Sequence, residues 1–166
     1  MDDKILNRLI IAIIFIISFV VCLFESSVVF GRDYSEWLKS CESYRNEVEQ
    51  ILRNEGLSTD YYYLMVAESR CRDKAESKAG AQGFWQLMPS TAKSYGCNNP
   101  HDLECSTKAA AKYIKQLEDR FNTFEKVIAA YNMGGHNLRK KGISSQAIGL
   151  VRRVKLIKKA DENDIF

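Results

Sequence analysis

The chain has 166 residues, a length typical of one folded domain. Hydrophobic residues make up 46% of it and charged residues 27%, with only 2 prolines and 9 glycines. This composition excludes a chain that is mostly disordered. The formal net charge of +3 is too small to indicate nucleic-acid binding, and no nucleic-acid partner is expected. It suits a partner that carries carboxylates or phosphates.

The N-terminus has the pattern of a secretory signal. Lys4 and Arg8 precede an apolar run from Leu9 to Phe24 that a single serine interrupts. A short basic region before about 16 apolar residues is typical of such signals, whereas a membrane-spanning helix usually needs about 20. Residues 1–31 are therefore expected to be either a cleaved signal peptide or a retained membrane anchor. In both cases residues 32–166 form an exported domain.

The cysteines of this exported domain indicate disulfides. Without residues 1–31 the count is even, and four cysteines permit three pairings. Cys97 with Cys105 is the most local pair, and Cys41 with Cys71 is its complement. A metal site at Cys97, His101 and Cys105 is disfavoured, because only three ligands are present and their spacing matches no usual zinc pattern.

The first half of the domain is predicted to contain two helices and a loop. One face of the first helix recurs at steps of three and four residues, at Trp37, Cys41, Tyr44, Val48 and Ile51. Gly56 is a plausible stop for this helix. A second, apolar helix is expected over Tyr61–Glu68 after a short turn. The polar stretch Arg72–Gly83 is expected to be a loop, and Pro89 to open a short helix after it.

The second half is predicted to be helical as well. The turn at residues 98–100 should precede an alanine-rich helix that Ser106 or Thr107 caps and that runs to about Phe121. Thr123 is expected to cap another helix that ends at residues 134–135. A last helix should begin at residues 144–145 and fade into an acidic tail near Asp161. The predicted fold class is therefore a single all-α domain.

Glu68 is the most informative acidic residue. It ends an apolar helix behind three consecutive tyrosines, residues 61–63. Poorly solvated surroundings raise the pKa of a carboxyl group and keep it protonated near neutral pH, which a general acid requires. The alternative is a solvated glutamate, or one paired with Arg70 or Arg72.

Two motifs carry a family resemblance. The first is Glu68-Ser69, then Ser77-x-x-Gly80-Ala81-x-Gly83, then Gln86-x-Met88-Pro89-x-Thr91-Ala92, and the second is Ala130-Tyr131-Asn132-Met133-Gly134. In this order and spacing they resemble the catalytic domain of soluble lytic transglycosylases, in the lysozyme-like superfamily. The resemblance covers roughly residues 57–155. It implies a lysozyme-like helical fold with a glycan-binding cleft.

The implied activity is cleavage of the β-1,4 bond between N-acetylmuramic acid and N-acetylglucosamine in peptidoglycan. Glu68 is the implied catalytic residue, as acid and then base, and the product carries a 1,6-anhydro ring on the muramic acid. Neither a metal nor an organic cofactor is expected. The implied location is the bacterial periplasm or cell envelope, with the inner membrane as the site of any anchor.

The resemblance also implies a set of substrate-binding residues. Ser77 would lie near the muramic N-acetyl group, and Tyr131 beside the reaction centre. Ser69 would either orient Glu68 or cap the local backbone. The complete expected set is Ser69, Ser77, Gln86, Met88, Tyr131 and Asn132.

Several departures from the family pattern keep alternatives open. Cys71 replaces an aromatic residue, and a disulfide there is expected to supply the missing rigidity. Asp73 is a potential second carboxylate, which leaves a hydrolase resembling goose-type lysozyme as the nearest rival. A wall-binding factor, or an enzyme serving a secretion, conjugation or pilus machine, is the further alternative. Residues 139–159 hold eight basic and no acidic side chains. They form either a solvated helix face or an electrostatic contact to anionic wall polymer or lipid headgroups.

Overall fold

The computed structural model describes residues 13, 16–17 and 34–164. The chain divides into two compact units, Met1–Tyr34 and Ser35–Phe166. Most of the predicted signal or anchor segment, residues 1–31, lies outside the described residues. None of the helices within the described ranges is long and apolar enough to cross a membrane.

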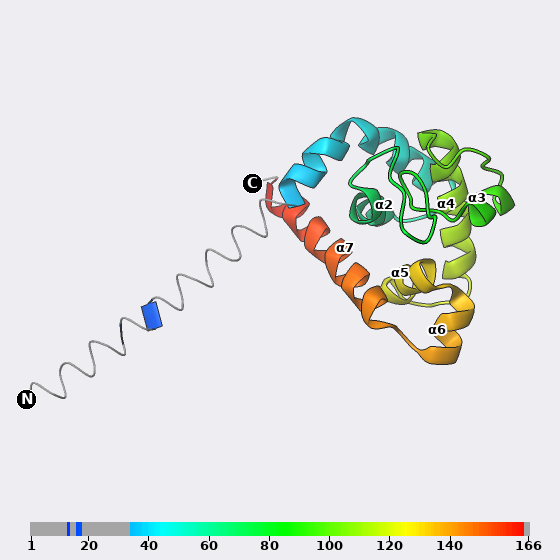
Figure 1. Cartoon of the computed structure of the whole chain (residues 1–166). Coiled ribbons are helices and arrows are strands. Elements are labelled where there is room, and N and C mark those ends of the chain that lie inside the picture. Colours follow the sequence, from blue (N-terminus) through cyan, green and yellow to red (C-terminus); the bar gives the residue numbers. More distant parts are fainter. Residues whose placement is uncertain (1–12, 14–15, 18–33, 165–166) are drawn as a thin grey trace, which may run out of the picture. The chain divides into compact units, whose positions relative to one another are not determined.

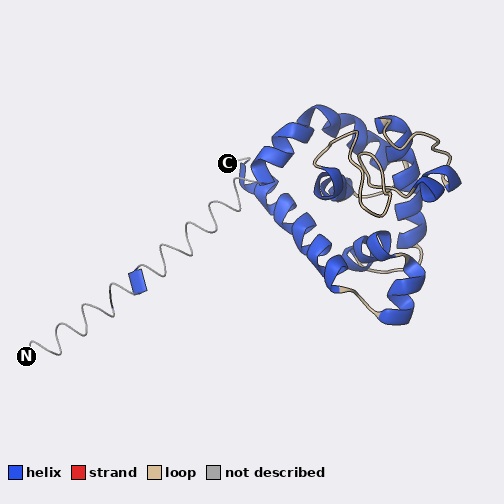
Figure 2. Cartoon of the chain, in the orientation of Figure 1, coloured by secondary structure: helices blue, strands red, loops and turns tan. Residues whose placement is uncertain are grey.

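The second unit consists of helices joined by loops, which confirms the predicted all-α class (Figure 2). A first helix covers residues 34–54. The elements that follow are η1 (Thr59–Tyr61), α2 (Tyr62–Ser69), α3 (Pro89–Ser94), α4 (Leu103–Glu118), α5 (Phe124–Met133), α6 (Gly135–Lys141) and α7 (Ser145–Asp164).

Helix α2 lies at the centre of this unit, with the 34–54 helix, α4, α5 and α7 around it (Figure 1). Every residue from Tyr62 to Ala67 is buried, because the α2 sequence is apolar on all sides of the helix. Helix α7 packs against both α2 and α5, and α4 packs against α5. The last turn of α2, which carries Glu68, is therefore held by neighbours on several sides.

The predicted apolar face of the first helix is confirmed. Cys41 and Val48 have no exposed surface, and Ile51 is 8% exposed. The helix ends before Gly56, which adopts a left-handed φ of 71°. A glycine takes this conformation without the steric cost that a side chain adds.

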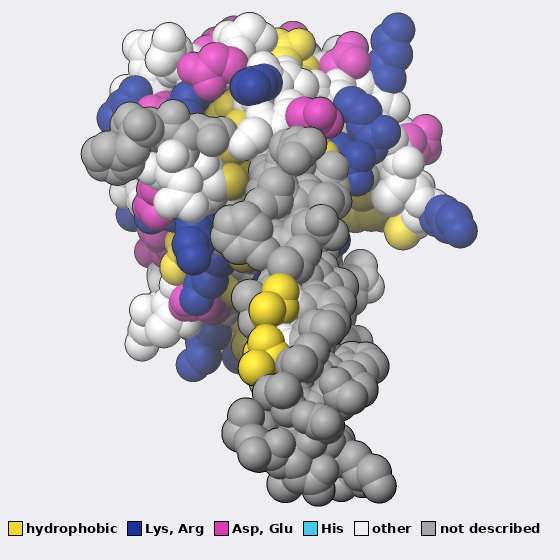
Figure 3. Space-filling view, turned by 90° about the vertical axis from the view of Figure 1, so that its left-hand side faces the viewer, with side chains coloured by type: hydrophobic (Ala, Val, Ile, Leu, Met, Phe, Trp, Pro, Cys, Tyr) yellow, Lys and Arg dark blue, Asp and Glu magenta, His cyan; other side chains and the backbone are white. Residues whose placement is uncertain are grey.

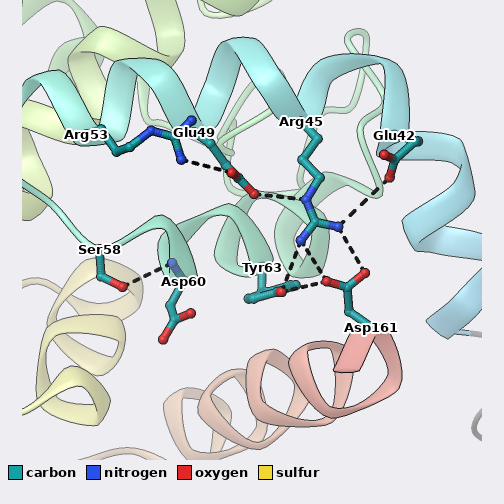
Figure 4. Close-up of polar contacts among 8 residues, drawn as sticks. All are labelled: Glu42, Arg45, Glu49, Arg53, Ser58, Asp60, Tyr63 and Asp161. Carbon is teal, nitrogen blue, oxygen red and sulfur yellow. Dashed lines mark hydrogen bonds and ion pairs between the residues drawn. The ribbon is translucent and has the colours of Figure 1, made fainter. Parts of the chain in front are cut away.

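A polar cluster ties the first helix to α2 and α7 (Figure 4). Arg45 donates to both carboxylate oxygens of Asp161, over 3.0 and 2.7 Å, and Tyr63 donates to the same carboxylate over 2.7 Å. The Arg45 hydrogen bond lowers the pKa of Asp161 below its usual range. The expectation that α7 fades near Asp161 is therefore wrong, since this buried residue anchors the last turns of the helix to the rest of the unit.

The start of α4 also differs from the prediction. Asp102 is the N-cap, and its carboxylate accepts from the Cys105 backbone N–H over 2.7 Å. Ser106 and Thr107, expected as caps, lie inside the helix and are fully buried. Aspartate is as good an N-cap as serine, so the alanine-rich pattern alone does not locate the first turn. The predicted cap of α5 is confirmed, because the Thr123 hydroxyl accepts from the Lys126 N–H.

The two disulfides form the most local of the three possible pairings. Cys97 is joined to Cys105, which links the end of the α3 region to the first turn of α4. Cys41 is joined to Cys71, which fastens the residue just beyond α2 to the first helix. The two bridges therefore lie on either side of the loop that follows Glu68.

Candidate active site

The backbone turns sharply just after Glu68. Helix α2 ends at Ser69, and the next two residues, Arg70 and Cys71, are left-handed with φ of 54° and 55°. This conformation is costly for residues with a side chain, and surrounding structure must stabilise it. The disulfide from Cys71 to Cys41 supplies part of that constraint.

Neither neighbouring arginine pairs with Glu68 among the described contacts. The Arg70 guanidinium stacks over the Trp37 ring at 4.0 Å, and Arg72 donates to the Ser69 carbonyl over 3.0 Å. The alternative of a surface ion pair for Glu68 is therefore not supported.

A tight loop faces the end of α2. The Ser77 hydroxyl accepts from the Ala81 N–H over 2.9 Å, and the Ser77 N–H donates to the Ala81 carbonyl over 2.9 Å. Gly83 has a φ of 73°, and a Cβ atom built there would lie 1.8 Å from the carbonyl oxygen of Pro100. Gly83, which belongs to the first motif, is thus required because the backbone of Pro100 lies too close for any side chain.

Gln86 holds the same loop from its other end. Its Nε2 donates to the carbonyl oxygens of Ala75 and Gly83, each over 3.0 Å. Gln86 itself is left-handed, with a φ of 49°. The two donated bonds fix the amide, so its oxygen is the end available to a ligand.

These elements enclose a cavity of about 410 Å³ next to Glu68. It is lined by most of the site residues expected from the sequence, which come from α2, the loop and α5. The expected residues that line it are Glu68, Ser77, Gln86, Met88, Tyr131 and Asn132. Glu68 is the one acidic side chain in the described lining.

Two tyrosines, Tyr131 and Tyr113, also line the cavity. Tyr131 is buried, and its hydroxyl donates to the Trp85 carbonyl over 2.8 Å. Trp85 in turn donates from its indole to Thr107 over 2.9 Å. The Tyr131 ring lies 5.3 Å from the ring of Tyr113, centre to centre. Burial raises the pKa of Tyr131 well above its usual range, so its hydroxyl remains a hydrogen-bond donor at neutral pH.

Burial also raises the pKa of Glu68, from an ordinary 4.5 to about 7. The positive charge of Arg153 opposes this shift, and its guanidinium donates to the Ala67 carbonyl over 3.3 Å. The direction of this shift agrees with the predicted carboxyl group that holds its proton near neutral pH. Such a group is suited to give a proton to a leaving oxygen and then take one back.

Two expectations for the site need correction. Ser69 is fully buried and outside the described lining of the cavity, so it is not placed to bind substrate. Its hydroxyl donates to the Met65 carbonyl over 3.4 Å, which agrees with the alternative of a bond to the local backbone. Adjacent helical residues point about 100° apart, so Ser69 and Glu68 face different neighbours. Asp73 is exposed and does not line the cavity; its carboxylate accepts from the Lys74 N–H over 2.9 Å.

Tyr113 and Gln146 also line the cavity, although the sequence analysis did not select them. Tyr113 comes from the middle of α4, where it resembles one more core residue of an alanine-rich helix. Gln146 lies in the first turn of α7, outside both motifs. A polar residue at the start of the last helix was the only signal for it.

A larger cavity, of about 530 Å³, lies elsewhere, beside η1 and α5. Its charged groups are already paired, with Lys158 2.6 Å from Asp60 and Tyr61 donating to Glu118 over 3.0 Å. Both of its carboxylates therefore already have partners, so the smaller cavity is the better candidate for chemistry.

Comparison with known proteins agrees with this site. The family model described as "Transglycosylase SLT domain" matches residues 48–149. Membrane-bound lytic murein transglycosylase D of Escherichia coli strain K12 is 28% identical over 115 residues, which cover 65% of this chain and 25% of the relative. A transglycosylase of Enterobacteria phage PRD1 is 32% identical over 84 residues, covering 51% of this chain and 31% of the relative.

A solved structure also has a similar fold. It is an inactive mutant of the lytic transglycosylase Slt from Pseudomonas aeruginosa, with a TM-score of 0.61 and 22% sequence identity. The match covers 68% of this chain and 23% of that chain. It confirms the expected lysozyme-like helical fold. The chain spans about a quarter to a third of the length of the curated relatives. Because the family model matches more than half of the chain, the chain belongs to the transglycosylase SLT domain family.

Proposed function

We propose that the chain is a peptidoglycan lytic transglycosylase that cleaves the β-1,4 bond between N-acetylmuramic acid and N-acetylglucosamine. The observation that carries the proposal is the single carboxyl group of the cavity. Glu68 has a pKa of about 7 and is the one acidic residue in the described lining. Family membership and the lytic murein transglycosylases among the relatives support the same activity.

In the proposed reaction Glu68 acts twice. Its protonated carboxyl group first gives a proton to the glycosidic oxygen, and the bond from that oxygen to C1 of the muramic acid breaks. The resulting carboxylate then accepts the proton of the C6 hydroxyl of the same sugar, whose oxygen closes onto C1. The atoms balance without water, and Glu68 ends the cycle protonated. Since the first step needs the proton, the rate should fall as the pH rises through about 7.

A hydrolase needs a second group to direct water or to form a glycosyl-enzyme. Asp73 was the nearest sequence candidate, but it lies outside the cavity lining and is exposed. The hydrolytic alternative is therefore not favoured. A wall-binding factor without activity is disfavoured as well, because such a factor has no need for a buried carboxyl group with a raised pKa.

The other cavity residues are proposed to bind the glycan. The Ser77 hydroxyl accepts one bond from Ala81 and keeps its own proton to donate, which suits an N-acetyl carbonyl. The Gln86 amide oxygen is the free end of a fixed side chain. Met88 is 42% exposed at the rim, where an apolar side chain suits the face of a sugar ring. Asn132 lines the wall beside Tyr131.

We infer an envelope location for the domain, with residues 1–31 as its signal peptide or tether. Support comes from the basic-then-apolar N-terminal sequence and from relatives described as membrane-bound. Service to a secretion, conjugation or pilus machine stays a prediction. Co-purification of the chain with proteins of such a machine is its test.

The test of the activity is mass spectrometry of purified peptidoglycan digested by residues 32–166, beside the Glu68→Gln variant. Glutamine keeps the size of the side chain and removes its proton transfer. Anhydro-muropeptides from the wild type, absent with the variant, are the expected result. Reducing-end products that depend on Glu68 would identify a hydrolase. A folded, disulfide-bonded wild type without any product would refute the proposed function.

A further inference from the structure

Helix α7 carries an exposed apolar groove away from the cavity. Within the described part of the second unit, three large hydrophobic side chains are strongly exposed: Met88, Ile143 and Ile148. Met88 belongs to the cavity, but the other two line one groove together with Val151 and Leu156. Ile148 is 56% exposed and Ile143 is 42% exposed. Their exposure is unexplained by the proposed glycan site.

Basic side chains line this groove or lie close to it along α6 and α7. Arg152 lines it, and Lys159 continues the same face of α7 two turns further on, because positions 148, 152, 155 and 159 lie on one side of a helix. Three more basic residues, at positions 139–141, end α6 just before Ile143. Within the described ranges, none of these five forms an ion pair with a carboxylate.

The groove has little negative charge to offset them. Its single acidic residue in the described lining, Glu125, forms an ion pair with Lys155. This pairing lowers the pKa of Glu125, so the pair stays neutral as a whole. Figure 3 views the left-hand side of Figure 1, where dark blue Lys and Arg side chains lie among magenta Asp and Glu and yellow hydrophobic ones.

We propose that this surface, formed by Ile143, Ile148, Arg152, Lys159 and residues 139–141, docks on a membrane that contains anionic lipids. Apolar side chains flanked by lysine and arginine are the combination that binds an interface, since the former enter the acyl boundary and the latter contact headgroups. Anionic wall polymer could bind the basic side chains, but it has no apolar phase for the exposed isoleucines to enter.

Docking through this surface would determine which way the cavity faces relative to the membrane. Gln146 lines the cavity, whereas Ile148 lines the groove. Two residues apart in an α-helix, their side chains point about 200° around the axis, which is nearly opposite. A domain held to lipid through Ile148 therefore turns the Gln146 side of α7 away from the membrane. In the envelope this is the direction in which a glycan substrate would lie.

The test is co-sedimentation of residues 32–166 with vesicles of phosphatidylcholine, with and without phosphatidylglycerol. This part of the chain has its own core and both disulfides, and a cooperative thermal transition is checked for every protein used. It also lacks the apolar N-terminal run, which would bind lipid by itself. Binding to the anionic vesicles, weakened by salt, is expected.

Two double variants probe the two halves of the surface. Arg152→Glu with Lys159→Glu should weaken binding more than tenfold, since each basic residue near an anionic surface contributes about fivefold. Ile143→Ser with Ile148→Ser should weaken binding at unchanged charge. The matched control is Lys93→Glu with Lys112→Glu, an equal charge change at exposed positions on α3 and α4, which should bind nearly as the wild type.

Three outcomes overturn the proposal. The folded wild type does not bind anionic vesicles, or the isoleucine variant binds as well as the wild type, or the control weakens binding as much as the charge variant of α7. Binding to purified wall carrying anionic polymer, with the same dependence on Arg152 and Lys159 but none on the isoleucines, would assign the surface to the wall instead.

Discussion

Ionisation of Glu68 should make the fold less stable as the pH rises from about 4.5 to about 7. Burial raises its pKa from 4.5 to about 7, whereas in the unfolded chain the carboxyl group ionises near its ordinary value. Between these two values the native state holds a proton that the unfolded state has released. The free energy of unfolding therefore falls as the pH rises. At about 1.4 kcal/mol for each pH unit, the ionised carboxylate costs the fold about 3 kcal/mol at pH 8.

The Glu68→Gln variant removes this cost, so it isolates the effect. Urea unfolding of residues 32–166 is measured for both proteins near pH 4 and near pH 8. Every other titrating group is common to the two, so it cancels in the difference. The free energy of unfolding of the variant minus that of the wild type is taken near pH 4 as the reference. Near pH 8 this difference should be about 3 kcal/mol larger, in favour of the variant. A difference that stays constant with pH would show that Glu68 ionises with an ordinary pKa, and would refute the reasoning.

Three further substitutions test the structure around Glu68. Gly83→Ala should destabilise the domain by several kcal/mol, because its Cβ would lie 1.8 Å from the Pro100 carbonyl oxygen. Gly80→Ala, also left-handed but in open space, should cost only about 1 kcal/mol, and equal urea midpoints for the two variants would contradict this. Tyr131→Phe should cost about 1–2 kcal/mol in the same assay, because it leaves the buried Trp85 carbonyl without its donor. A variant as stable as the wild type would show that this bond contributes little.

Local chemistry was sufficient to predict most of the fold. The helical period located the buried face around Val48, Thr123 marked the start of α5, and Pro89 opened α3 in its first turn. These signals act over a few residues, so a single sequence contains them in full. The start of α4 was mistaken because Asp102 and Ser106 are both good caps, and only the three-dimensional context selects between them.

The features that were not predicted depend on contacts between residues far apart in the sequence. The pairing of Arg45 with Asp161 joins residues far apart in the chain, so the acidic end of α7 resembled a solvated tail. The same limit applies to the site. The motif residues were found because their two motifs resemble those of a known family, whereas Tyr113 and Gln146 lie outside both motifs and reach the cavity from other helices. Ser69 is a neighbour of Glu68 in sequence but is buried, and of its two expected roles only the bond to the local backbone is observed.

The most direct test of the proposed mechanism is digestion of peptidoglycan in water labelled with heavy oxygen. If the muramic C6 hydroxyl is the nucleophile and Glu68 is the sole acid and base, the new chain ends take up no label. Heavy oxygen at C1 of the new ends would show that water attacks the bond. The domain would then be a hydrolase, and a second group for directing that water would have to be found outside the cavity lining described for Glu68.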